Sequence, residues 1–220
     1  MRVFNKQEKL YLLLITFILL FSILTVIVAL DYSDNIDKDI SRSISGVPGD
    51  LLFESMRYIT NMGSFYFLLP ASITVLVLFY YLKEPLLSIL FVVMMLSLIP
   101  AYRIVKYILG RQRPSIDFIH ETGYSYPSGH TVGAFTFFIG LYVFYQFFYK
   151  KEQNYLLLVI CISLATLVGL SRIVLGVHFL SDVIGGALLS GILITSFTII
   201  HHLFKDEVGG KLERKLKNHD

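Results

Sequence analysis

Long apolar runs alternate with short polar stretches along the 220-residue chain. A lipid bilayer offers the backbone no hydrogen-bond partners, so apolar runs of about 18 residues or more must cross it as helices. Six runs fit this description, and they cover residues 10–30, 65–82, 86–105, 129–149, 155–175 and 178–204. The pattern predicts an all-α fold, a six-helix transmembrane bundle that forms a single domain over residues 1–220.

The longest connection between two runs is the loop over residues 31–64. It begins with several aspartates, and it then carries Leu52, Met56 and Ile59 at the i, i+4, i+7 spacing of a helix. Asp50 precedes these positions as a helix cap, and a glycine at 63 follows them. We therefore expect a short amphipathic helix over 50–63, which serves either as a packing element across the mouth of the bundle or as a lid for lipid.

The positive charges divide unevenly between the two sides of the predicted membrane. One side carries eleven of the nineteen Lys and Arg residues, namely Arg2, Lys6, Lys9, Lys83, Lys150, Lys151, Lys205, Lys211, Arg214, Lys215 and Lys217. Lys and Arg mark the cytoplasmic side, so we expect both termini, including a basic tail over 205–220, to lie inside a plasma membrane. The net charge of +3 comes from these short flanking segments, and it does not indicate nucleic-acid binding.

Three polar clusters follow or precede apolar runs on the opposite, extracytoplasmic side. The first holds Lys106 and Arg113, seven residues apart and followed by Pro114. In a helix this spacing is about two turns and places both cations on one face. Taken alone, the pair is also typical of cations that anchor a helix at the membrane surface.

The second cluster directly precedes the fourth run and reads Tyr126-Pro127-Ser128-Gly129-His130. Ser128 is a typical helix cap, and Gly129 allows backbone N–H groups to approach a bound anion at the helix start. His130 then lies in the first turn and faces that anion.

The third cluster contains Arg172, His178 and Asp182. His178 and Asp182 are four residues apart, so on a helix their side chains lie on one face. The carboxylate can then accept a proton from one ring nitrogen and leave the other nitrogen free to attack. A purely structural His–Asp pair would have the same spacing.

Together, Lys-x6-Arg-Pro, Pro-Ser-Gly-His and Ser-Arg-x5-His-x3-Asp resemble the type 2 phosphatidic acid phosphatase superfamily of lipid phosphate phosphatases. All three motifs match without a departure, from Lys106 to Asp182. The small size, the six spans and the pair His120-Glu121 are similar to a bacterial branch that includes phosphatidylglycerophosphate phosphatase B and undecaprenyl pyrophosphate phosphatases.

The resemblance implies that His178 is the nucleophile, that Asp182 orients it, and that His130 is the general acid and base. It also implies that phosphate is bound by Lys106, Arg113, Ser128, Gly129 and Arg172. These cations would take the place of a metal ion, so we expect no cofactor.

The resemblance implies that the substrate is a lipid (pyro)phosphate such as undecaprenyl pyrophosphate or phosphatidylglycerophosphate, which would give a role in phospholipid metabolism or cell wall biogenesis. The motifs recognise only phosphate, so they do not select among lipids, and nothing in the sequence indicates an oligomeric state. Two other functions are compatible with the same pocket: transfer of phosphate to an acceptor other than water, and lipid-phosphate binding or transport without catalysis.

Overall fold

The computed structural model describes residues 5–114, 119, 121–149 and 153–217, with side chains described up to residue 205. Over this part of the chain the structure is helical and contains no strand. The elements in chain order are α1 (Lys6–Ala29), α2 (Asp34–Ile44), α3 (Leu51–Ile59), the 3₁₀ helix η1 (Thr60–Gly63), α4 (Phe65–Tyr81), α5 (Pro85–Leu109), α6 (Gly129–Tyr149), α7 (Tyr155–Val174) and α8 (Leu180–Lys217). The all-α prediction is confirmed.

Five described helices are long and apolar enough to cross a membrane, and they are α1, α5, α6, α7 and the first 26 residues of α8. The sixth candidate is α4, which has 17 residues and meets the same criteria together with α3 and η1, across a bend of 45°. Side chains on the outside of the bundle are apolar, and Leu19 and Ile23 of α1 are more than half exposed. Such a surface is stable in lipid and not in water.

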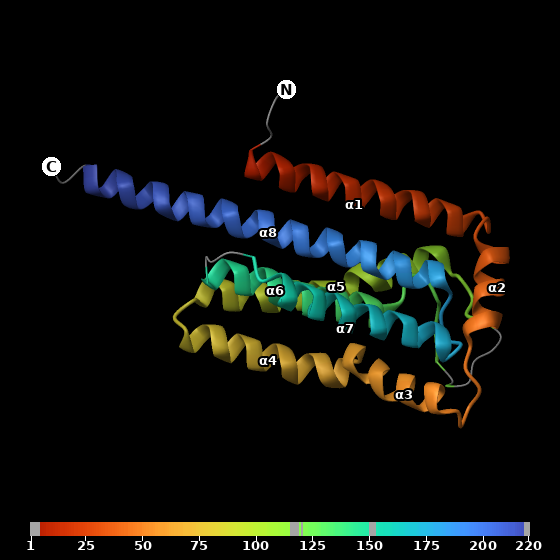
Figure 1. Ribbon diagram of the computed structural model, residues 1–220. Helices are drawn as coiled ribbons and strands as arrows, with labels where there is room; N and C mark the ends of the chain where they lie inside the picture. The colour runs from red at the N-terminus through yellow and green to blue at the C-terminus, as the bar shows by residue number, and fades with distance from the viewer. Residues whose placement is uncertain (1–4, 115–118, 120, 150–152, 218–220) are drawn as a thin grey trace.

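The helices lie side by side and give the bundle two distinct ends (Figure 1). The start of α1, the end of α8 and the turn between α4 and α5 lie at one end. At the other end α2 crosses the bundle, close to the connections that follow α5 and α7. The polar motifs of the sequence belong to this second end.

Aromatic side chains of α5 and α6 form the centre of the core. The ring of Phe91 packs edge-on against Phe137 and Phe144, with ring centroids 5.9 and 5.4 Å apart. Phe91 and Phe144 are completely buried. Helix α6 packs against α5, α7 and α8, so the residues at its start have a fixed position relative to all three.

The outer loop contains one helix more than the sequence predicted. The expected amphipathic helix is present as α3 and η1, with Asp50 at the N-cap position. Helix α2 was not predicted, although Ile36, Ile40 and Ile44 lie at the i, i+4, i+8 spacing of one helix face; its buried positions are the polar residues Asp37 and Ser41. Ile36 and Ile44 are exposed, so the apolar stripe of α2 is not the face that packs on the bundle.

Some residues used in the sequence analysis lie outside the described residues. These are Arg2, His120, Lys150 and Lys151. The side chains of the basic tail beyond Lys205 are also outside the described part, although the backbone of α8 continues as a helix to Lys217.

We predict that Gly186→Ala destabilises the protein. A Cβ at Gly186 would lie 2.9 Å from the Cβ of Thr131 and 3.0 Å from the backbone oxygen of Ser128, and neither can move without shifting α6. Overpacking of this kind costs about 1–3 kcal/mol, which lowers the thermal midpoint of the purified protein in detergent by several degrees.

The control is Gly191→Ala on the same helix. The three atoms nearest its Cβ would all belong to the ring of Phe17, at 2.6 to 2.8 Å. Phe17 belongs to the weakly buried helix α1 and can rotate towards lipid. An equal loss of stability in both variants would show that the close contact between α6 and α8 is not the constraint.

Candidate active site

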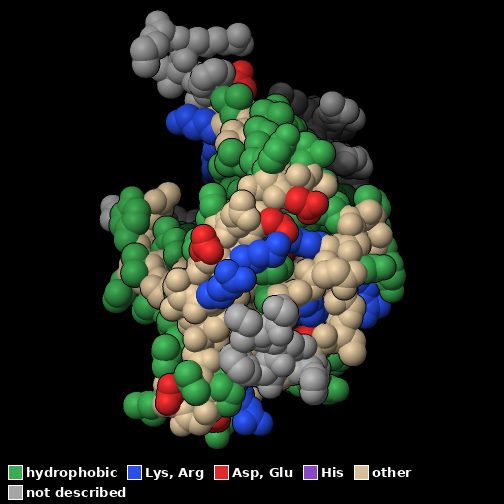
Figure 2. All heavy atoms as spheres, turned by 90° about the vertical axis from the view of Figure 1, so that its right-hand side faces the viewer, with side chains coloured by type: hydrophobic (Ala, Val, Ile, Leu, Met, Phe, Trp, Pro, Cys, Tyr) green, Lys and Arg blue, Asp and Glu red, His purple; other side chains and the backbone are tan. Residues whose placement is uncertain are grey.

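Charged side chains gather at the end of the bundle that α2 crosses. Figure 2 looks at this end and shows Lys and Arg side chains in its middle, with acidic side chains beside them and apolar ones towards the rim. The charged groups come from α2, from the connection after α5 and from the start of α8, and these segments are far apart in the sequence.

His178 and Asp182 form a buried pair at the start of α8. Nδ1 of His178 lies 3.2 Å from Oδ2 of Asp182, and the two residues are 2 % and 0 % exposed. His178 precedes α8, which begins at Leu180, so the two residues do not share a helix face as the sequence analysis expected. The turn at Gly176, where φ is +69°, brings the imidazole back to the carboxylate instead.

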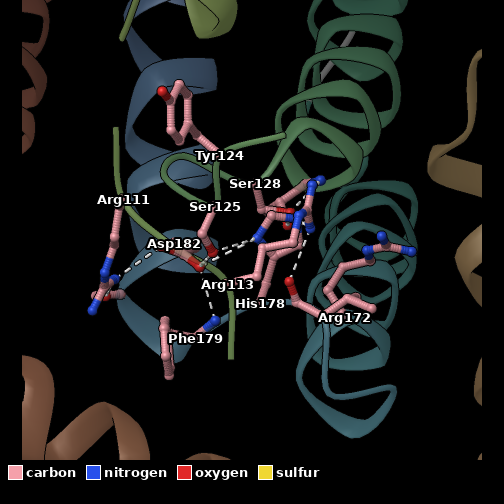
Figure 3. Close-up of polar contacts among 12 residues, drawn as sticks. Arg111, Arg113, Tyr124, Ser125, Ser128, Arg172, His178, Phe179 and Asp182 are labelled. Carbon is pink, nitrogen blue, oxygen red and sulfur yellow. Dashed lines mark hydrogen bonds and ion pairs between the residues drawn. The ribbon is translucent and has the colours of Figure 1, made fainter. Parts of the chain in front are cut away.

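The other ring nitrogen of His178 faces a cation. Nε2 lies 3.2 Å from Nη1 of Arg113, which can only donate a hydrogen bond (Figure 3). The contacts with Asp182 and Arg113 are both satisfied when Nδ1 carries the proton and the lone pair of Nε2 faces Arg113. Burial is the main cause that lowers the pKa of His178 to about 3, against the opposing effect of Asp182. The imidazole is therefore neutral at physiological pH.

The other cations of the motifs are held by backbone and by acidic groups. Lys106 donates hydrogen bonds to the carbonyl oxygens of Tyr124 and Ser125, and Arg113 donates to those of Gly123 and Val177. Helix α5 ends at Leu109 with Gly110 in the left-handed conformation at φ +63°. The expectation that Lys106 and Arg113 lie on one face of a helix is therefore wrong, because Arg113 follows the end of α5.

Glu121 forms ion pairs with two arginines. Its carboxylate contacts Nη2 of Arg172 and lies 3.6 Å from Nη2 of Arg113. Burial acts to raise the pKa of Glu121, but the charge of Arg172 and its hydrogen bond outweigh burial and lower this pKa to about 2. Glu121 is thus an anion placed between the two arginines that the motifs provide.

The start of α6 shows two kinds of contact. The Oγ of Ser128 accepts hydrogen bonds from the N–H and the hydroxyl of Thr131, at 3.4 and 2.9 Å, so it caps the helix. The backbone N–H of Ser128 donates to the backbone oxygen of Asp182, at 3.0 Å. Gly129 and His130 instead line a cavity.

This cavity has a volume of about 920 Å³ and joins two different environments. Its polar end is lined by Lys106, Arg113, Glu121, Gly129, His130 and His178. Its apolar part runs between α4 and α5 and is lined by residues such as Leu68, Leu69, Ile73, Leu76, Met95 and Ile99. Ser128, Arg172 and Asp182 are not part of this lining, and Arg172 contacts the lining residue Glu121.

Three further residues of the site were not predicted. Ser125 donates a hydrogen bond to Oδ2 of Asp182, Glu121 pairs with the arginines, and Arg111 forms an ion pair of 2.9 Å with Oδ1 of Asp182. Arg111 was visible in the sequence as a third cation between Lys106 and Arg113. Nothing in the local pattern showed that it points to a different partner.

The described residues include no group of three or more His, Cys, Asp or Glu side chains that could hold a metal ion. The acidic groups beside the site are paired with arginines: Asp37 and Asp182 with Arg111, and Glu121 with Arg113 and Arg172. The side chains in the cavity that are suited to phosphate are therefore the cations Lys106 and Arg113 and the imidazoles of His130 and His178.

Comparison with known proteins identifies the chain. A family model described as the PAP2 superfamily matches residues 85–206, which is more than half of the sequence. The chain belongs to the PAP2 superfamily. The match contains Lys106, His130, His178 and Asp182, so it includes all three motifs.

Individual PAP2 relatives agree in sequence and structure. The chain is 27 % identical over 175 residues to phosphatidylglycerophosphatase B of Bacillus subtilis (strain 168). The aligned region covers 78 % of this chain and 86 % of the relative. A crystal structure of a transmembrane PAP2 type phosphatidylglycerolphosphate phosphatase from Bacillus subtilis matches with a TM-score of 0.78 at 28 % identity, covering 87 % of this chain and 96 % of the other. The structure of Aquifex aeolicus LpxE matches with a TM-score of 0.54 at 26 % identity, covering 74 % and 94 %.

This PAP2 protein is therefore a multi-pass membrane enzyme, a lipid phosphatase of the bacterial type. The expectations of the family, the six-helix transmembrane fold and the enzyme class are confirmed. The geometry places a neutral imidazole at the junction between an apolar groove and a cationic pocket.

We predict that Glu121→Gln strengthens inhibition by vanadate, an analogue of phosphate. The carboxylate of Glu121 must leave Arg113 and Arg172 before an oxyanion can bind there, whereas an amide competes weakly for them. A decrease of about tenfold in the inhibition constant corresponds to about 1.4 kcal/mol. Since the pKa of Glu121 is about 2, inhibition of the unaltered enzyme should show no titration of this group between pH 5 and pH 8.

Glu54→Gln is the matched control, because Glu54 pairs with the exposed Arg57 on α3. Unchanged or weaker vanadate inhibition in Glu121→Gln would show that the carboxylate does not stand where the anion binds.

Proposed function

We propose that the protein hydrolyses the terminal phosphate of phosphatidylglycerophosphate through a phosphohistidine intermediate on His178. The observation that supports this most is the shape of the cavity. One continuous space connects the apolar groove between α4 and α5 with His178. The relatives from Bacillus subtilis named for this substrate support the choice of lipid.

The two parts of the cavity suit the two parts of the substrate. Acyl chains would enter between α4 and α5, where the lining is apolar and the bundle surface faces lipid. The phosphate would displace Glu121 from Arg113 and Arg172, and Lys106 and the N–H of Gly129 would contact its other oxygens. Charge-assisted hydrogen bonds of this kind are stronger than neutral ones. Ser128 would act indirectly, by capping α6 and placing Gly129 and His130.

The reaction would proceed in two balanced steps. Nε2 of His178 attacks phosphorus, the bond to the lipid oxygen breaks, and His130 gives this oxygen a proton. A water molecule then attacks the phosphohistidine, loses a proton to His130, and releases inorganic phosphate and His178. Asp182 stabilises the imidazolium formed in the first step, and the cations stabilise the charge on the phosphoryl oxygens without a metal ion.

The site would face the outside of the plasma membrane, with both termini in the cytoplasm. The start of α1 and the end of α8 lie at the end of the bundle opposite to α2 (Figure 1). The end that holds both termini carries the excess of Lys and Arg in the sequence, and such an excess marks the cytoplasmic side.

The central prediction is that purified protein releases phosphate from phosphatidylglycerophosphate, and does so in excess chelator. We expect lower kcat/KM for undecaprenyl pyrophosphate and for phosphatidate. His178→Ala should abolish turnover and the acid-labile phosphoenzyme. Absence of release from every lipid would favour a silent lipid-phosphate binder, and release that depends on an alcohol acceptor would favour a phosphotransferase.

A second prediction separates the two histidines. His130→Ala should reduce kcat by a factor of about 10² to 10⁴ on phosphatidate, because the lipid alkoxide is a poor leaving group that needs a proton. The loss should be smaller on undecaprenyl pyrophosphate, whose leaving group is a stabilised lipid phosphate. Equal losses on both substrates in steady-state assays would exclude His130 as the general acid.

The orientation can be tested by cysteine labelling of intact cells. In a Cys161→Ala background, Asp39→Cys on the exposed surface of α2 should react with a membrane-impermeant maleimide. Lys83→Cys, between α4 and α5, should react only after the cells are opened. The opposite pattern would place the site in the cytoplasm.

A further inference from the structure

Arg111 is the centre of a buried charge cluster beside the His178–Asp182 pair. Its side chain is 8 % exposed. Nη1 donates hydrogen bonds to Oδ1 of Asp182 at 2.9 Å and to Oγ of Ser181 at 2.6 Å. Nη2 donates to Oδ2 of Asp37 at 2.8 Å. The guanidinium also lies over the ring of Phe179, 4.5 Å from its centroid.

The two oxygens of Asp182 have different partners. Oδ1 accepts from Arg111, whereas Oδ2 faces Nδ1 of His178 and accepts from Ser125 and from the N–H of Phe179. With Oδ1 fixed by a charged donor, the carboxylate cannot rotate and Oδ2 stays opposite the imidazole. The orientation of His178 therefore depends on a contact at the far side of Asp182.

Asp182 also needs a positive charge, because a fully buried carboxylate is costly unless it is paired. His178 cannot supply this charge while it is neutral, which is the form that attacks phosphorus. Arg111 supplies it, and one planar guanidinium can serve both Asp182 and Asp37.

Helix α2 holds Arg111 from the other side. Asp37 is 2 % exposed, and besides Arg111 it accepts hydrogen bonds from the N–H of Ser181, at 3.0 Å, and from the Ser181 hydroxyl. Asp37 therefore binds the first turn of α8, where Asp182 lies, as well as Arg111. Asp34 adds a longer contact of 3.3 Å to Arg111.

Arg111 does not belong to the phosphate pocket. It is absent from the lining of the cavity that contains Lys106, Arg113 and His178. Figure 3 shows Arg111 on one side of Asp182, with His178, Arg113 and Arg172 on the other. A role in binding the substrate is therefore not supported by its position.

We propose that Arg111 is a positioning residue of phosphoryl transfer, which fixes and neutralises the carboxylate of Asp182, and that Asp37 of α2 holds Arg111 in place. The outer-loop helix α2 is then part of the catalytic assembly. This inference rests on the proposed roles of His178 and Asp182.

The test measures kcat, KM and vanadate inhibition separately. Arg111→Met should lower kcat by about 100-fold, because the support of a catalytic group is lost, and should change KM and vanadate inhibition by less than about threefold, because the phosphate pocket is intact. Arg111→Lys should recover part of kcat, since it keeps the charge but not the two-pronged geometry. When Asp182→Asn is already present, adding Arg111→Met should lower the single-turnover rate constant by less than about threefold.

Asp37→Asn provides a milder second variant if Arg111→Met does not fold, and it should lower kcat by about tenfold at an unchanged KM. Arg42→Gln is the matched control on the same helix, because Arg42 is exposed and pairs only loosely with Asp39 at 4.0 Å, and it should leave kcat unchanged.

The outcomes distinguish this inference from the proposed function. Turnover that survives His178→Ala would overturn the proposed function itself. If His178→Ala is inactive, the inference about Arg111 fails when kcat of Arg111→Met and Asp37→Asn stays within about twofold of the unaltered enzyme. It also fails if Arg111→Met lowers the rate constant by the same factor in the unaltered enzyme and in Asp182→Asn, since the two residues would then act independently.

Discussion

A carboxylate buried at the start of α8 is the constraint on which the polar end of this protein depends. Asp182 has no exposure to solvent, yet it faces the imidazole of His178 and an arginine at once. A buried anion is stable only when charged and hydrogen-bonding groups surround it. The N–H of Phe179, the hydroxyl of Ser125 and the guanidinium of Arg111 all donate hydrogen bonds to this one carboxylate.

This requirement explains why a membrane bundle carries polar helices at one end. Helix α2 contributes Asp37, and the connection after α5 contributes Arg111 and Arg113. In the remainder of the bundle the core is dominated by apolar and aromatic side chains, and apolar side chains cover the surface that faces lipid. The cavity lies at the boundary, and in the proposed function it would hold the lipid in its apolar groove and the phosphate beside the cations and His178.

The sequence predicted the parts of this arrangement that local patterns express. Hydrophobic runs located the membrane helices within a few residues, and three spaced motifs indicated the family. It did not predict α2, although Ile36, Ile40 and Ile44 have helical spacing, because that stripe is not the face that packs. It also did not predict the contact between Arg111 and Asp182, which are 71 residues apart. It also extended helical geometry to Arg113 and His178, although both lie outside helices and reach the site through turns at Gly110 and Gly176.

The amino-acid sequence by itself determined which segments cross the membrane and which residue types are available for phosphate chemistry. The reason is that backbone burial in lipid and motif spacing are local properties of the chain. Only the tertiary structure decided which cation faces the cavity and which faces Asp182. Lys106, Arg111 and Arg113 are similar in sequence context, and their different partners follow from the packing of α2, α6 and α8 around them.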